Sequence, residues 1–243
     1  MYSALTGVLA GFAFAGILLI ATERISTPKA GSQEKSPPQD RRQASLVLLL
    51  SAFLGLSISS LTYAIIAGET SSNELAAVQH VLAGSGFAVS ALALLAAVHV
   101  LIQDLFPSVS SWTRVTIGMG APAVSTIYVG EGAIQAQNAT GGIGLTILVL
   151  IILASVFWHV LAIIWAFTKK ESNITWRQSQ FFASLSVAIA FVASVGVATL
   201  QSIDIDSTPT QFAWISFATI LITMGSFTVV FGVKLKQVKL VGH

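Results

Sequence analysis

Long apolar runs alternate with short polar segments along the whole chain, and the longest run guides the interpretation of the others. Residues 144–168 carry no charged side chain and are followed directly by Lys169 and Lys170. At about 1.5 Å of rise per residue, a helix over this run crosses the roughly 30 Å hydrocarbon core of a bilayer. The run therefore predicts a transmembrane helix whose lysine end stays in the cytoplasm.

Six further runs of similar character predict a single domain, residues 1–243, built as a bundle of seven transmembrane helices. Between the first two runs, residues 23–45 hold prolines and charges without periodicity, which is typical of a flexible loop. We therefore expect an all-α integral membrane protein with a flexible cytoplasmic loop at 23–45. The predicted spans are residues 2–22, 46–67, 75–103, 112–131, 144–168, 181–200 and 211–233.

The composition supports this fold class. Hydrophobic residues make up 54% of the chain and charged residues 9%, and the mean hydropathy is +0.83. A soluble domain is nearer a quarter charged, so this chain has too little polar surface to cover itself in water. The net charge of +2 does not indicate nucleic acid, because the basic residues gather on one side of the predicted bundle. Cysteine is absent, which excludes disulfides, thiolate metal sites and a cysteine nucleophile.

The charges also predict an orientation. All twelve Lys and Arg lie after the first, third and fifth predicted spans or at the C-terminus. The positive-inside rule then places the N-terminus outside and the C-terminus in the cytoplasm, which requires an odd number of spans. We expect the plasma (cell) membrane as the location. The opposite side carries only acidic charges, at Glu69, Glu74, Glu131, Asp204 and Asp206.

The fourth predicted span, 112–131, is interrupted by Pro122. A mid-helix proline kinks a helix and frees a backbone carbonyl, which a membrane tolerates only where protein or water satisfies it. We therefore expect this helix inside the bundle and a ligand or ion site beside it. An imidazole next to a carboxylate would bind a cation or pass a proton. The alternative is that Glu131 simply sits in the headgroup region and His80 caps a helix end. The candidate site residues are His80, Ser125, Thr126, Tyr128 and Glu131.

Two other histidines, His99 and His159, are predicted at similar depth on different helices. Such a pair could ligate a haem iron, with Trp158 and Trp165 lining the flat cofactor. The alternative is that these histidines and tryptophans form an interfacial belt. Apart from haem, no cofactor is expected.

Three classes of function remain open. The first is transport, conduction or sensing of a small solute or ion near the kinked span. The second is a non-catalytic subunit of a larger membrane complex, suggested by small-residue faces such as Gly7, Gly11 and Ala15 that let helices approach. The third is a bis-histidine haem protein. We do not expect an enzyme, since HExxH, Walker and GxSxG motifs are absent. The expected partners are the lipid bilayer, a small solute or ion and other membrane proteins, without nucleic acid.

Overall fold

Four long helices make up the described part of the protein. The computed structural model describes residues 2–26, 39–68, 73–106 and 176–202, together with the single positions 108, 149, 153, 157 and 160. The helices are α1 (Tyr2–Ser26), α2 (Gln39–Ala67), α3 (Asn73–Leu105) and α6 (Trp176–Ser202). Each contains a stretch long and apolar enough to cross a membrane: Ser3–Thr22, Arg42–Ala67, Gln79–Ile102 and Ser179–Leu200.

These four helices confirm four of the predicted spans as helical and apolar. The predicted spans 112–131 and 211–233 lie outside the described residues, and of 144–168 only four single positions are described, all with exposed side chains. The helices run beyond the predicted spans, because hydropathy marks only the apolar core while backbone hydrogen bonding continues past it. The loop predicted at 23–45 was wrong at both ends, since residues 23–26 belong to α1 and residues 39–45 belong to α2.

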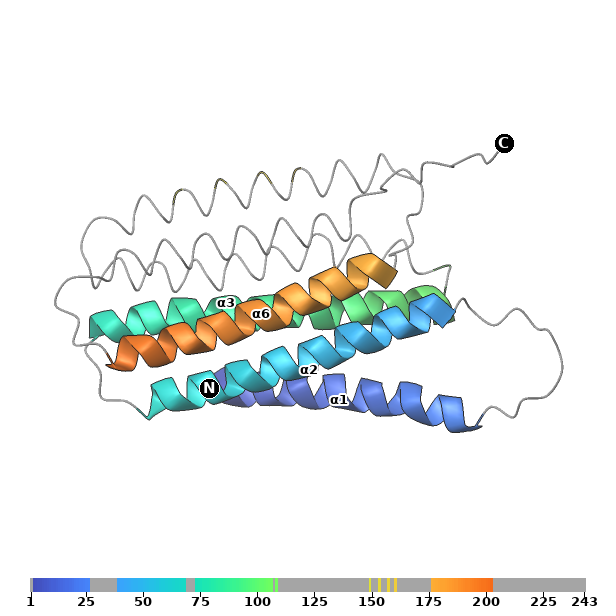
Figure 1. The fold of residues 1–243 in the computed structure, drawn as a ribbon, viewed down its shortest axis with the longest axis horizontal. Coiled ribbons are helices and arrows are strands. Elements are labelled where there is room, and N and C mark those ends of the chain that lie inside the picture. The colour runs from blue at the N-terminus through green and yellow to red at the C-terminus, as the bar shows by residue number, and fades with distance from the viewer. Residues whose placement is uncertain are drawn as a thin grey trace.

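The helices alternate in direction. Helix α2 runs antiparallel to α1, and α3 runs antiparallel to α2. Helix α6 runs antiparallel to α3 and parallel to α2 (Figure 1). Helix α2 packs against α1, α3 and α6, and α3 also packs against α6. Helix α1 packs almost entirely on α2. The described bundle is therefore a three-helix core of α2, α3 and α6, with α1 on the outer side of α2.

Burial differs sharply between α3 and α1. Every residue from Val81 to Ser90 is buried, so α3 is enclosed on all sides over that stretch. In contrast, α1 exposes large apolar side chains such as Phe12 and Leu19. A lipid environment accommodates exposed apolar side chains such as those of α1, because lipid tails solvate them as well as protein does.

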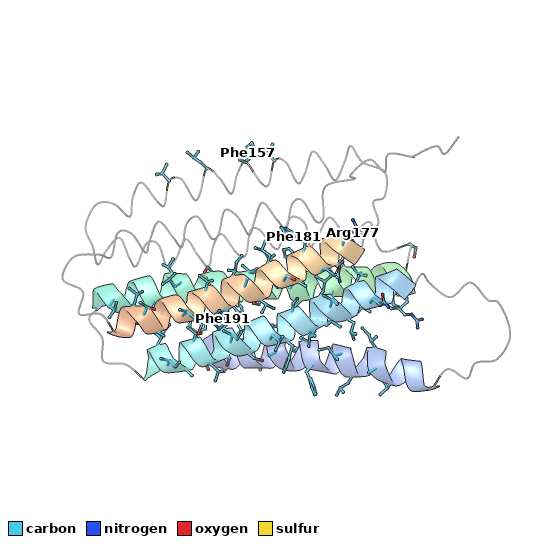
Figure 2. The ribbon with its side chains drawn as sticks, viewed as in Figure 1. Phe157, Arg177, Phe181 and Phe191 are labelled. Atoms are coloured by element: carbon cyan, nitrogen blue, oxygen red, sulfur yellow. The ribbon has the colours of Figure 1, made fainter. Side chains whose placement is uncertain are left out.

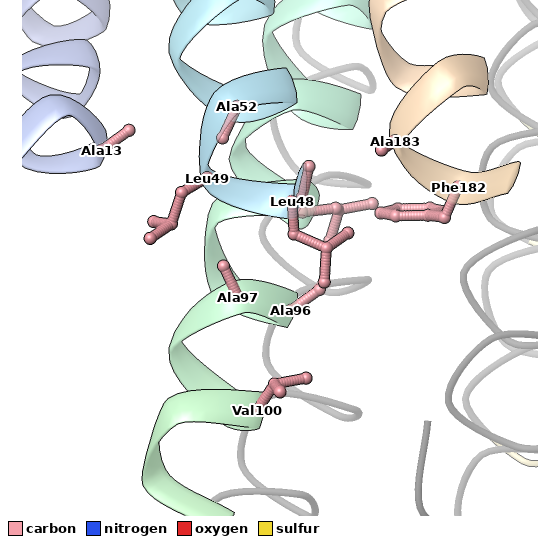
Figure 3. Packing of buried hydrophobic residues seen from close by; sticks show 11 residues of the cluster. Ala13, Leu48, Leu49, Ala52, Ala96, Ala97, Val100, Phe182 and Ala183 are labelled. Atoms are coloured by element: carbon pink, nitrogen blue, oxygen red, sulfur yellow. The ribbon is translucent and has the colours of Figure 1, made fainter. Parts of the chain in front are cut away.

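Large and small side chains interlock in the core. In one cluster, Leu48 of α2 and Phe182 of α6 are completely buried, and Ala96 and Val100 of α3 complete the contact (Figure 3). A second cluster, towards the other end of the bundle, centres on Leu56 of α2. Alanines opposite leucines and phenylalanine let the helices approach closely without leaving voids.

Between these clusters, α2 and α3 meet through two Gly-xxx-Ser pairs. A methyl group at Gly55 of α2 would collide with the hydroxyl of Ser90 on α3, and one at Gly86 of α3 would lie 3.5 Å from the Oγ of Ser59 on α2. Each serine donates to the carbonyl of the glycine on its own helix, Ser59 to Gly55 and Ser90 to Gly86, both at 2.8 Å. The hydroxyls are thereby satisfied within their own helices, which leaves the faces free to approach.

The α1–α2 contact is fixed by a different pair. The Oγ of Ser60 donates to the carbonyl oxygen of Ser3 at 3.0 Å, and the Oγ of Ser3 donates to the carbonyl oxygen of Ser60 at 3.3 Å. Farther along, a Cβ on Gly16 of α1 would lie 3.2 Å from Leu49 of α2. These contacts set the antiparallel register of the two helices.

Candidate functional site

The predicted site residues are only partly within the described chain. Ser125, Thr126, Tyr128 and Glu131 lie outside it, as does His159. His80 and His99 are both in α3. The juxtaposition of His80 with Glu131 and that of His99 with His159 therefore stay predictions.

His80 lies near the end of the bundle where α2 gives way to α3. Its side chain is half-buried, and its ring centroid is 6.1 Å from that of Tyr63, with 34° between the ring planes. Tyr63 belongs to the last turns of α2 and is only 4% exposed. The half-buried imidazole of His80 therefore lies beside the buried phenol ring of Tyr63.

Two further polar residues adjoin this pair in the sequence. Gln79 precedes His80 and is fully buried; its Oε1 atom accepts no hydrogen bond in the described chain, although the residue makes another polar contact. Thr62, next to Tyr63, donates its hydroxyl to the carbonyl oxygen of Ile58 at 2.8 Å. Imidazole and phenol together offer both donors and acceptors, so the Tyr63–His80 pair has groups that can bind a small polar solute or exchange a proton.

Sequence reasoning missed Tyr63 as the neighbour of His80. A signal for this pairing existed. Two antiparallel helices joined by a short connection bring together residues at similar distances from it. Tyr63 lies five residues before the polar segment 68–74 and His80 six residues after it. Applying that rule to the polar residues of the two spans would have paired Tyr63 with His80.

The charges of the described helices are distributed unevenly between the two ends. The four described arginines are in the end turns where α1 finishes and where α2 and α6 begin: Arg24, Arg41, Arg42 and Arg177. Asp104, near the end of α3, is at that same end of the bundle. The end that holds His80 and Tyr63 has Glu74 as the one charged residue among those described.

His99 occupies a different environment. It is 1% exposed, and it makes a polar or electrostatic contact within the protein. It lies nine residues from Ser90, about two and a half helical turns, so it projects from the side of α3 opposite the contact of Ser90 with α2. Among the described residues no group of three or more His, Cys, Asp or Glu side chains gathers to hold a metal ion.

Comparisons with known proteins add no family to this description. The chain matches no protein-family model, no curated protein and no solved structure.

Proposed function

We propose that the protein is a seven-helix membrane protein that transports or senses a small solute or ion at the end of the bundle that holds His80. The observation that carries the proposal is the pairing of half-buried His80 with buried Tyr63 at the end without arginine among the described residues. A polar group held within an apolar helix is costly, so its presence favours a functional role.

The orientation belongs to the same proposal. In the described helices, the four arginines lie at one end, and the predicted spans place the remaining eight basic residues on the same side. The positive-inside rule assigns that end to the cytoplasm, so the His80 end faces outward in the plasma membrane. A ligand would then reach the site from outside.

His80 supplies the chemistry of the proposed site. Imidazole is the side chain that gains and loses a proton near neutral pH, and it also binds cations in its neutral form. Tyr63 offers a hydroxyl beside it. The predicted fourth span would add the carboxylate of Glu131, which balances a bound cation or accepts a proton.

The function can be tested in proteoliposomes loaded with the pH-sensitive dye pyranine. An external acid pulse, applied with and without Na⁺ or K⁺, should produce a flux that His80→Gln and Glu131→Gln reduce at least tenfold and Tyr63→Phe reduces less. Thr199→Val is the matched control, because Thr199 is exposed at the same end and its hydroxyl bonds to the carbonyl of Val195 in its own helix at 2.8 Å. Undiminished flux in folded His80→Gln protein would eliminate the site, and no flux above empty vesicles would eliminate proton or cation transport.

The orientation has its own test, which the absence of cysteine makes clean. Gly68→Cys lies at the His80 end and Ser108→Cys at the arginine end, and both positions are exposed. A membrane-impermeant maleimide added to intact cells should label Gly68→Cys, and Ser108→Cys only after permeabilisation. The reverse pattern would invert the proposed topology.

A second candidate function, a subunit of a larger membrane complex, is favoured by one observation. Gly11 and Ala15 lie on an exposed face of α1, and no atom comes within 4 Å of a Cβ built on Gly11. Small residues on an outward face are typical of helices that receive another helix. If this function holds, Gly11→Leu should release a co-purifying membrane protein, whereas Phe12→Leu should not. A single species of one chain from native membranes would contradict it.

A further inference from the structure

The exposed face of α6 carries its charge at one end only. Arg177 is the one charged residue in Trp176–Ser202, and its side chain is exposed. The residues that follow it on the same face are uncharged and predominantly apolar. They recur at helical spacing along the whole length of α6: Phe181, Ser184, Ala188, Phe191, Val192, Val195 and Thr199.

The length of this face matches a bilayer. From Arg177 to Thr199 the helix rises about 33 Å at 1.5 Å per residue, close to the roughly 30 Å of the hydrocarbon core. Arg177 therefore stands at the level of the lipid phosphates when the apolar face lies in the acyl chains. Phe181 is one turn below it and 60% exposed, on the same side of the helix (Figure 2).

A second arginine lies at the same depth on the neighbouring helix. Helices α2 and α6 are parallel, and their register brings Gly55 beside Ala190, with a Cβ on Gly55 3.6 Å from the Cβ of Ala190. Carrying that register back along both helices sets Arg42 of α2 level with Arg177. Arg42 is partly buried and also makes a contact within the protein, so Arg177 is the more accessible of the two.

We propose that the exposed face of α6 binds an anionic phospholipid. The headgroup phosphate contacts Arg177, and the part of an acyl chain nearest the headgroup packs against Phe181. The guanidinium is suited to phosphate because its fork of N–H groups can donate two hydrogen bonds to the phosphate oxygens. The described carboxylates at this end belong to other helices: Glu23 to α1, Asp40 to α2 and Asp104 to α3. Arginine near an anionic membrane surface strengthens attachment by about 1 kcal/mol, or about fivefold.

The experiment places the purified chain in nanodiscs that contain equal amounts of phosphatidylcholine and phosphatidylglycerol. Native mass spectrometry then measures the ratio of the two lipids that stay bound. Wild-type protein should retain phosphatidylglycerol preferentially, and Arg177→Gln should lower that preference about fivefold. Arg177→Lys should give an intermediate preference, because lysine keeps the charge but lacks the guanidinium fork. Thr199→Val, at the opposite end of the same face, is the matched control.

Three results would overturn the proposal. These are an unchanged lipid ratio in Arg177→Gln, an equal loss in Thr199→Val, and displacement of the lipid by inorganic phosphate at millimolar concentration, which would assign the arginine to a soluble anion. Because Arg177 is exposed, Arg177→Gln should melt at the wild-type temperature in phosphatidylcholine alone, which separates lost binding from lost folding. The measurement involves no solute flux, so it stands independently of the proposed function.

Discussion

The hydroxyl of Ser90 on α3 fills the space that a side chain at Gly55 on α2 would need. A Cβ built on Gly55 would also lie 3.0 Å from the Cβ of Ser90, which is tighter than most Cβ contacts in proteins. The relationship is repeated in reverse one turn away, where Ser59 of α2 lies over Gly86 of α3. Helices α2 and α3 therefore fit together at two sites, each with a glycine on one helix facing a serine on the other.

Gly55→Ala should destabilise the protein. The added methyl overlaps Ser90, so α2 and α3 must separate or shift, which costs about 1–3 kcal/mol of the free energy of unfolding. Unfolding by SDS in mixed micelles would measure the loss. Adding Ser90→Gly should recover most of it, because the overlapping side chain is removed.

The control for this prediction is Gly11→Ala in α1. Gly11 is also in the middle of a helix, but a Cβ there meets nothing within 4 Å. Its free energy of unfolding should stay the same or rise by up to about 1 kcal/mol, since alanine favours helix over glycine. An equal loss of unfolding free energy in Gly55→Ala and Gly11→Ala would contradict the close packing of Gly55 against Ser90.

Along the seam between α3 and α6, two glycines should respond in opposite ways. A Cβ at Gly86 would lie 3.2 Å from the Cα of Ala190, and backbone cannot move without moving the helix. Gly86→Ala should therefore cost about 1–3 kcal/mol. A Cβ at Gly196 would meet Leu82 at an ordinary 3.5 Å, so Gly196→Ala should be neutral or stabilising in the same SDS titration. Equal effects at the two positions would argue against this packing.

Ser60→Ala should loosen α1. It removes the hydrogen bond from Ser60 to the Ser3 carbonyl, and hydrogen bonds between membrane helices contribute about 0.6 kcal/mol on average and at most about 1.7. The expected readout is faster hydrogen exchange in the first turns of α1, around Ser3, with little change in the melting of the rest. Thr22→Val is the control, because the Thr22 hydroxyl donates to the carbonyl oxygens of Leu18 and Leu19 in its own helix, at 2.9 and 3.0 Å.

Two phenylalanines of α6 should separate packing in the core from contact with lipid. Phe182 is completely buried against Leu48, whereas Phe191 is 61% exposed. Phe182→Ala should lower the free energy of unfolding by about 3–5 kcal/mol, because it leaves a cavity. Phe191→Ala should lower it by less than about 1 kcal/mol, since lipid tails fill the space. Similar losses would mean that Phe191 is covered in the membrane.

The sequence predicted the existence of the four described helices well, and their contacts poorly. Apolarity over some twenty residues identifies a span, because only a helix satisfies its backbone in lipid. The same apolarity hides which side packs on protein, since lipid and core accept the same side chains. The predicted face of Gly7, Gly11 and Ala15 shows the difficulty. All three residues are exposed, and a Cβ on Gly7 would lie 3.7 Å from the Oγ of Ser60 on α2, whereas one on Gly11 would meet nothing within 4 Å.

The candidate site was predictable to a similar extent. His80 stood out because a titratable side chain in an apolar run is rare. Its neighbour Tyr63 did not, because tyrosine near a helix end is common in membrane proteins, and only the antiparallel register of α2 and α3 links the two. Helix ends were also misjudged, since α2 begins at Gln39 in a charged stretch that hydropathy assigns to a loop.

The enclosed position of α3 has a consequence for how the chain is assembled. Helices α1 and α2 can join as a hairpin as soon as both have left the ribosome, because their contact needs no later segment. The surface of α3 at Gly86, however, packs against Ala190 and Ala193 of α6, which are synthesised much later. Until then α3 must wait in the membrane or the insertion machinery with an open groove. Nascent chains halted before residue 176 should consequently be the ones that cellular quality control recognises and degrades.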